Sequence, residues 1–108
     1  MFVHGMRAKE LANHLAEGDK SPVLLDVREP WEFAIGHLAH ARLLPMGQIP
    51  HALDSLDPNE EIVVICHHGV RSRQVAQFLL SRGFKRVINL DDGIDGWSRD
   101  VDPSVPRY

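Results

Sequence analysis

The only cysteine of this 108-residue chain, Cys66, lies in a segment whose residue types could support nucleophilic chemistry. The β-branched run 62–65 before it is typical of a strand buried on both faces, and an amphipathic helical pattern begins at Ser72. Open α/β sheets bind ligands at such a loop, between the carboxyl end of a strand and the amino end of a helix. Because loop N–H groups and the helix dipole both favour an anion there, we expect Cys66 to be a reactive thiolate.

Two other residues of the loop favour this interpretation over a buried, inert cysteine, which is what most free cysteines are. Gly69 allows the backbone to approach a ligand closely and to adopt positive φ if the turn needs it. Arg71 adds a fixed positive charge that could hold an oxyanion within reach of the sulfur. We therefore predict that Cys66 is a nucleophile and that Arg71 helps to bind its substrate.

Length and composition predict one globular domain. The chain is 44% hydrophobic and 25% charged, with a formal net charge of −3, which gives no indication of a nucleic-acid or membrane partner. A single cysteine excludes an internal disulfide and suits a reducing cytoplasm, and no apolar run has signal-peptide or membrane-span length. We expect a single domain over 1–108, with its core over about 7–100 and an extended C-terminal tail over 101–108.

The elements that must position the loop alternate along the chain. Hydrophobic periodicity and turn residues predict helices over 7–17, 31–35 and 72–82, a weaker helix over 46–53, and a short last helix holding Trp97. Strands are predicted over 23–27, 41–44, 62–65 and 87–90. Short strands that alternate with helices predict an α/β fold with a largely parallel sheet.

Three motifs in this order resemble the single-domain rhodanese family of thiosulfate-type sulfurtransferases. Each motif is weak alone, but together they are specific and cover about residues 7–100. The motifs are Leu25-Asp26-Val27-Arg28 with Glu32-Phe33, Gly36-His37-Leu38 and Pro45; Cys66-x-x-Gly69-x-Arg71-Ser72; and Gly93-x-x-x-Trp97. The resemblance implies a rhodanese-like three-layer sandwich, with a central, mostly parallel sheet and helices on both faces. His40 and Asp92 stand where the family often has glycine, which puts the local turns in doubt.

The resemblance also implies a mechanism. Cys66 would take the outer sulfur of a small-molecule donor such as thiosulfate, carry it as a persulfide, and pass it to a thiol or cyanide acceptor. The substrate-binding residues would be His67, His68, Gly69, Val70, Arg71 and Ser72, whose amides would surround the persulfide. Ser72 would cap the helix behind the loop, and Arg71 would orient the sulfonate oxygens of the donor. This chemistry needs no metal and no organic cofactor.

Two other functions stay open. One is a sulfur-carrier or regulatory rhodanese module that exchanges sulfur with protein partners through Cys66. The other, less favoured, is a cysteine-dependent phosphatase, because such enzymes place five residues between cysteine and arginine whereas residues 67–70 are all that separate Cys66 from Arg71. A metal site at Cys66, His67 and His68 is disfavoured, since adjacent side chains in a tight loop rarely converge on one ion.

Several polar and aromatic residues outside the loop are expected to be structural. Asp26, Arg28 and Glu32 should form a charge network that holds the segment after the second predicted strand. His37 is expected to be a hydrogen-bonded structural histidine. Trp31 and Trp97 are expected to be packing residues.

Overall fold

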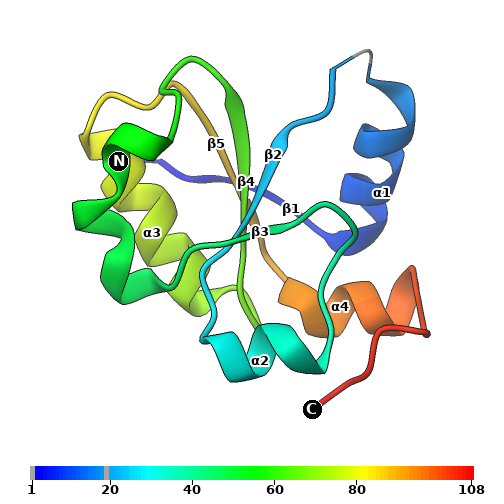
Figure 1. Cartoon of the computed structure of the whole chain (residues 1–108). Coiled ribbons are helices and arrows are strands. Elements are labelled where there is room, and N and C mark those ends of the chain that lie inside the picture. Colours follow the sequence, from blue (N-terminus) through cyan, green and yellow to red (C-terminus); the bar gives the residue numbers. More distant parts are fainter. Residues whose placement is uncertain (1, 19) are drawn as a thin grey trace.

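The computed structural model describes residues 2–18 and 20–108, and its centre is a five-stranded sheet in the order β1-β5-β4-β2-β3 (Figure 1). Every neighbouring pair of strands is parallel. The strands are β1 (His4–Met6), β2 (Val23–Asp26), β3 (Arg42–Leu43), β4 (Glu61–Ile65) and β5 (Arg86–Leu90). The predicted α/β fold with a mostly parallel sheet is therefore confirmed, and the sheet is parallel throughout.

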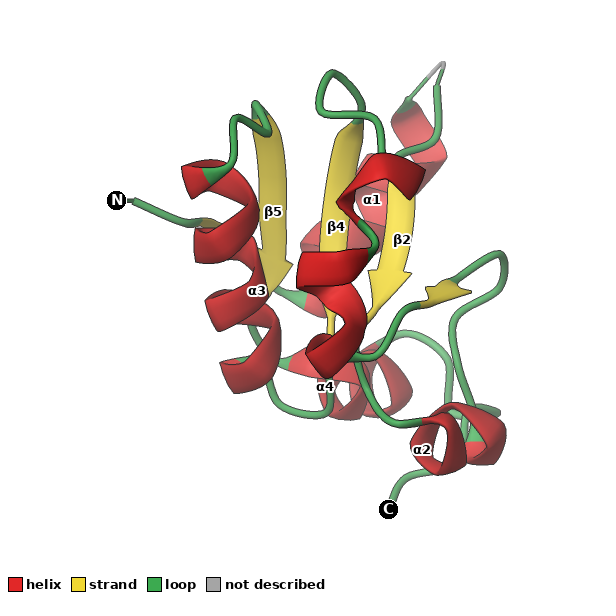
Figure 2. Ribbon diagram, turned by 60° about the vertical axis from the view of Figure 1, so that its left-hand side comes forward, coloured by secondary structure: helices red, strands yellow, loops and turns green. Residues whose placement is uncertain are grey.

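The middle strand, β4, is buried on both faces, as its β-branched composition predicts. Ile62 and Val64 pack into the cluster that α3 (Val70–Ser81) covers, whereas Val63 and Ile65 pack into the cluster beneath α1 (Ala8–Glu17) and α4 (Gly93–Asp100). Figure 2 shows these helices on the two sides of the sheet. The resulting layers are helix, sheet and helix, with Cys66 at the end of the strand that lies between them.

The boundaries of some elements differ from those predicted. The helix expected over 72–82 begins two residues earlier, at Val70, because Gly69 takes a left-handed conformation and starts it. The helix expected over 46–53 is two short 3₁₀ helices, η1 (Met46–His51) and η2 (Leu53–Ser55). Pro50 lies inside η1, and because proline cannot donate the backbone hydrogen bond that a helix interior needs, it disfavours one continuous α-helix over 46–53. The three-residue strand β1 was not predicted, since it is too short for alternation to show.

The remaining helix, α2 (Pro30–Ile35), lies between β2 and β3 in the chain and beside the C-terminal segment in space (Figure 1). Residues 101–108 form no helix or strand. They make a turn in which the Val105 N–H donates to the carbonyl of Asp102, and the Val105 side chain is buried against the α1–α4 face of the sheet. This turn brings Tyr108 back to α2.

The two departures from the rhodanese pattern have different structural outcomes. His40 has φ of 66°, so it occupies the left-handed conformation in which glycine is favoured. Asp92 has φ of −100°, and the left-handed residue of that turn is Gly93, with φ of 61°. The Asp92 carboxylate also accepts the backbone N–H of Ala8 at 3.0 Å and so caps the amino end of α1. The turn at Asp92 therefore does not need a glycine at position 92.

Within residues 2–18 and 20–108, no helix combines the length and the apolarity that crossing a bilayer requires.

Candidate active site

Cys66 directly follows β4, at the carboxyl end of the central strand, and its side chain is 1% exposed. Its Sγ accepts the backbone N–H of Gly69 at 3.1 Å and that of Ser72 at 3.4 Å. Ser72 is in the first turn of α3, where backbone N–H groups have no partner within the helix. The loop and the helix amino end thus direct partial positive charge at one sulfur atom.

The glycine of the loop is required by its conformation and by its surroundings. Gly69 has φ of 99°, in the left-handed region, and any Cβ at this position would lie 2.2 Å from the backbone oxygen of Asp91. The positive φ that the sequence allowed for is therefore present. The close approach to Asp91 joins the loop to the segment after β5.

The amino end of α4 holds the other side of the loop backbone. The N–H groups of Ile94 and Asp95 donate to the carbonyls of Cys66 and His67, at 2.9 and 3.1 Å. A Cβ on Gly93 would lie 2.1 Å from the His67 oxygen, so this helix can approach the loop only because glycine begins it. The third sequence motif therefore positions the second.

Arg71 does not extend a free charge from the loop. Its Nη1 and Nη2 donate to Oε1 and Oε2 of Glu32 at 2.7 and 2.9 Å, in a bidentate ion pair between α3 and α2. The Glu32 side chain is 5% exposed, and the hydrogen bonds from Arg71 lower its pKa from the ordinary value to about 2 even though burial opposes this shift. The same pair raises the pKa of Arg71. The guanidinium is thus neutralised by a carboxylate before any substrate arrives.

Asp26 and Arg28 form the structural network that the sequence suggested, and Glu32 joins it through its backbone carbonyl, which accepts Nη1 of Arg28 at 3.4 Å. Arg28 Nε and Nη2 donate to Asp26 at 2.9 and 2.8 Å, and both side chains are fully buried. Arg28 Nη2 also donates to the carbonyl of Gly36 at 2.8 Å, which ties the end of α2 to β2. The carboxylate of Glu32 instead faces Arg71.

The structure adds one residue that the sequence did not indicate, Tyr108. Its hydroxyl donates to Oε2 of Glu32 at 2.7 Å and accepts from Nη1 of Arg28 at 3.0 Å. Its ring stacks on the imidazole of His67 at 3.9 Å, and His67 in turn stacks on His68. Burial raises the pKa of Tyr108 and lowers the pKa of His67. No local pattern could identify this contact, because it depends on the turn over 102–105.

The two tryptophans differ from each other. Trp97 packs partly buried against the core, as predicted, but Trp31 is 63% exposed and meets Tyr108 edge to face, with 6.0 Å between ring centroids. Trp31 therefore packs against Tyr108 at the surface and not in the core. Its position on α2, next to Tyr108, makes it part of an exposed aromatic rim beside His67 and the ion pair of Arg71. His37 is a hydrogen-bonded histidine, with Nδ1 2.9 Å from the carbonyl of Phe33.

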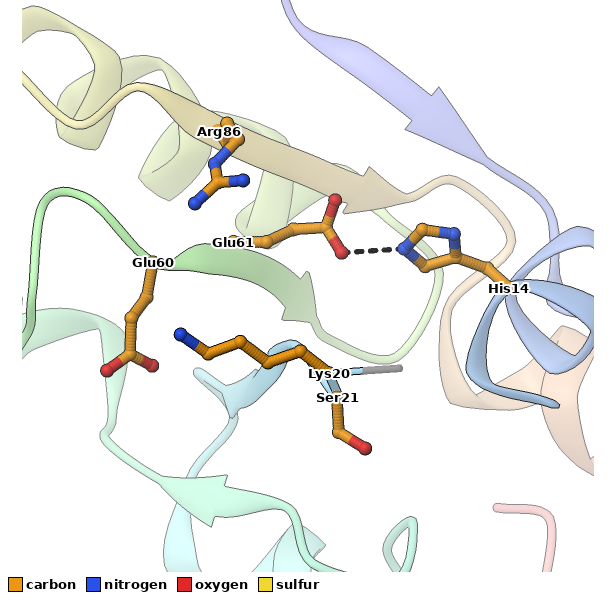
Figure 3. A pocket seen from close by; sticks show the side chains of 6 residues that line it. All are labelled: His14, Lys20, Ser21, Glu60, Glu61 and Arg86. Carbon is orange, nitrogen blue, oxygen red and sulfur yellow. Dashed lines mark hydrogen bonds and ion pairs between the residues drawn. The ribbon is translucent and has the colours of Figure 1, made fainter. Parts of the chain in front are cut away.

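A separate charged pocket of about 230 Å³ lies at the other end of the sheet (Figure 3). Glu61 and Arg86 in its wall begin β4 and β5, whereas Cys66 follows the end of β4. The residues that line it are His14, Lys20, Ser21, Glu60, Glu61 and Arg86. His14 Nε2 lies 2.6 Å from Oε1 of Glu61, so this pair accounts for part of its polar surface. In the described part of the chain, no three His, Cys, Asp or Glu side chains gather as metal ligands would.

Comparison with known proteins agrees with this geometry. A thiosulfate sulfurtransferase GlpE of Actinobacillus pleuropneumoniae is 38% identical over 90 residues, which cover 83% of each chain. The Rhodanese-like/PpiC domain-containing protein 12 of Arabidopsis thaliana, a chloroplastic protein, is 43% identical over 89 residues, but these are 30% of its length. The crystal structure of a rhodanese-like domain protein from Staphylococcus aureus superposes with a TM-score of 0.84 at 32% identity, covering 98% of this chain and 99% of that one. Residues 7–100 match the rhodanese-like domain family, and the chain belongs to this family of sulfurtransferases.

Proposed function

We propose that this protein moves a sulfane sulfur from a donor such as thiosulfate to a thiol or cyanide acceptor through a persulfide on Cys66. The observation that carries the proposal is the pair of backbone N–H groups, from Gly69 and Ser72, on the buried Sγ. These donors stabilise negative charge on sulfur without any rearrangement of the loop. Similarity to the rhodanese-like family supports this reaction class, and Cys66 is the nucleophile in the proposal because the chain has no other cysteine.

The proposed reaction has two half-reactions. The Cys66 thiolate attacks the outer sulfur of thiosulfate, the S–S bond of the donor breaks, and its electron pair leaves with sulfite. The acceptor thiolate or cyanide then attacks the outer sulfur of the persulfide, and the Cys66 thiolate is regenerated. The negative charge of the Cys66 thiolate lies on the outer sulfur once the persulfide has formed, and both positions are near the amino end of α3. No metal or organic cofactor takes part.

The geometry changes the role that we propose for Arg71. A sulfonate ligand gains most from a cation whose charge is not already balanced, and two of the five N–H donors of Arg71 bind the carboxylate of Glu32. We infer that the Arg71–Glu32 pair mainly fixes the loop against α2. Donor binding then rests more on the amides of residues 67–72 than on the guanidinium.

Transfer to a protein acceptor is a second candidate, favoured by the exposed aromatic rim. Trp31 is 63% exposed beside Tyr108, and Val70, the first residue of α3, is 68% exposed. Large apolar side chains exposed next to a reactive residue are more typical of a surface that a macromolecule covers than of a site for thiosulfate alone. In this case Cys66 would receive or deliver sulfur within a transient protein complex.

The persulfide itself provides the test. Incubation with thiosulfate alone should raise the intact mass of the protein by one sulfur atom. The added sulfur should map to the peptide that holds Cys66, and cyanide should remove it. The variant Cys66→Ser should show no mass gain and less than a tenth of wild-type transfer. Initial rates should give the parallel double-reciprocal lines of a ping-pong scheme. Intersecting lines without a mass gain, or aryl-phosphate hydrolysis at a comparable rate, would contradict the proposal.

A further inference from the structure

Asn89 is a fully buried polar residue on β5, directly opposite Val64 of β4 in the register of the sheet. It is outside the three sequence motifs, and its side chain extends to the loop that holds Cys66. Its Nδ2 donates to the carbonyl of Gly69 at 3.2 Å and to Oδ1 of Asp91 at 2.8 Å. Both protons of the amide nitrogen therefore have acceptors.

These two contacts fix the orientation of the amide, because the nitrogen cannot accept a hydrogen bond. The amide oxygen then faces Ser72, and the Ser72 hydroxyl lies 2.5 Å from Oδ1 of Asn89. Since Oδ1 has no proton to give, Ser72 must be the donor in this hydrogen bond. A serine hydroxyl has a single proton, so it cannot donate to anything else at the same time.

The orientation of the Ser72 hydroxyl affects Cys66 because the two side chains are in contact. Oγ of Ser72 lies 3.3 Å from the Sγ of Cys66, and with its proton on Asn89 it offers the sulfur only lone pairs. A lone pair can accept the S–H of a thiol, but it repels the negative charge of a thiolate. The hydroxyl therefore acts against the N–H groups of Gly69 and Ser72, which favour the thiolate.

We propose that Asn89 is a positioning residue that aims the Ser72 hydroxyl away from Cys66 and so holds the unloaded cysteine as a thiol. A thiol resists alkylation and oxidation better than a thiolate does. In the persulfide, which rests on the proposed function, the inner sulfur is uncharged and the negative charge lies on the outer sulfur. The lone pair of Ser72 thus disfavours the unloaded thiolate without opposing the loaded state.

The pH dependence of alkylation tests this role without any sulfur donor, so the result does not depend on the proposed reaction. In Asn89→Leu, the Ser72 hydroxyl is free to donate to the thiolate, and the pH at half-maximal alkylation by iodoacetamide should fall by about one unit. In a Ser72→Ala background, Asn89→Leu should produce no such fall. A variant of the same strand, Ile88→Val, controls for loosened core packing and should leave the midpoint unchanged.

A merely structural Asn89 predicts the opposite sign. Loss of its bond to the Gly69 carbonyl would loosen the loop, withdraw the amides from the sulfur and raise the midpoint. An unchanged or raised midpoint in Asn89→Leu, or an equal fall in Ile88→Val or in the Ser72→Ala background, would overturn the proposal.

Infrared spectroscopy of the S–H stretch gives a second measurement that needs no Asn89 variant. The chain has one cysteine, so any S–H band belongs to Cys66. At neutral pH the wild type should show an S–H band shifted to lower frequency by its bond to Ser72, and Ser72→Ala should move the band back. The absence of an S–H band at neutral pH, or the same frequency in both proteins, would overturn the proposal even if Asn89→Leu fails to fold.

Discussion

Arg71 and Glu32 are joined by two parallel hydrogen bonds, of 2.7 and 2.9 Å, although they lie 39 positions apart in the chain. One residue belongs to the first turn of α3 and the other to the first turn of α2. A bidentate pair of this kind fixes orientation as well as distance. The loop of Cys66 is therefore braced from the side of α2, and the charge of Arg71 is balanced within the protein.

The ion pair predicts a specific acid dependence of stability. The pKa of Glu32 is about 2 in the folded protein, below the ordinary value of about 4.3 in an unfolded chain. A carboxyl whose pKa is depressed by folding stabilises the fold above the unfolded value, and this contribution is lost as pH falls from about 4.3 through about 2. We expect Glu32→Gln to lose roughly 1–3 kcal/mol of unfolding free energy at pH 7.

Urea unfolding at a series of pH values checks this prediction. The difference between wild type and Glu32→Gln should shrink as pH falls through the acid range. Glu17→Gln, at an exposed carboxylate near the end of α1, is the matched control and should change little. A difference that stays constant down to pH 2 would show that packing of Glu32, and not its charge, is responsible.

Donor preference tests whether Arg71 contacts substrate. Because the guanidinium is engaged by Glu32, we expect Arg71→Ala to lower the kcat/KM for thiosulfate and for an uncharged polysulfide by similar factors, roughly tenfold each. Steady-state rates with both donors, in parallel with Arg71→Lys, would measure this. A loss confined to thiosulfate would mean that Arg71 leaves Glu32 and binds the sulfonate during turnover.

Tyr108 should control the protonation of His67. Its ring covers the imidazole, and burial lowers the pKa of His67 in the folded protein. Tyr108→Ala should therefore raise the pKa of His67 toward the ordinary value, whereas Tyr108→Phe keeps the stack and should shift it less. NMR titration of the imidazole measures both, and an unchanged pKa in Tyr108→Ala would contradict the prediction.

The left-handed His40 is expected to be a site of avoidable strain. A side chain at φ of 66° is disfavoured relative to glycine, so His40→Gly should stabilise the protein by about 0.5–1 kcal/mol. The neighbouring exposed Ala39 is the control, since glycine there should only increase the entropy of the unfolded chain and destabilise. Thermal unfolding of the two variants should move in opposite directions, and a lower melting temperature in His40→Gly would contradict the prediction.

These contacts show which parts of the site a sequence can predict. The strand of residues 62–65, the loop of Cys66 and the need for Gly69 depend on neighbours in the chain, so composition and spacing were sufficient. Asn89 and Tyr108 could not be identified in this way. Asn89 has the ordinary appearance of a polar residue near a strand end, and its role arises from the pairing of β5 with β4.

The ion pair of Arg71 shows a different limit. Residue types alone indicated a cation near a thiolate, which led to the prediction of a sulfonate ligand. The partner of a cation depends on how α2 packs, and no periodicity in residues 30–35 encodes the direction of one carboxylate. A sequence can therefore predict that a charged residue lies at a site more easily than it can predict whether another residue already balances that charge.

The hydrogen bonds from α4 to the loop of Cys66 have a consequence for the order in which the protein is synthesised and folds. The carbonyls of Cys66 and His67 receive their hydrogen bonds from Ile94 and Asp95, which leave the ribosome after the cysteine does. A nascent chain that ends at residue 92 already carries the thiol but lacks the helix that shapes its loop. We expect a purified fragment of residues 1–92 to react with iodoacetamide like a free cysteine and to gain no sulfur from thiosulfate. The nucleophile would thus acquire its chemistry late, only once residues 93–100 have emerged and folded onto it.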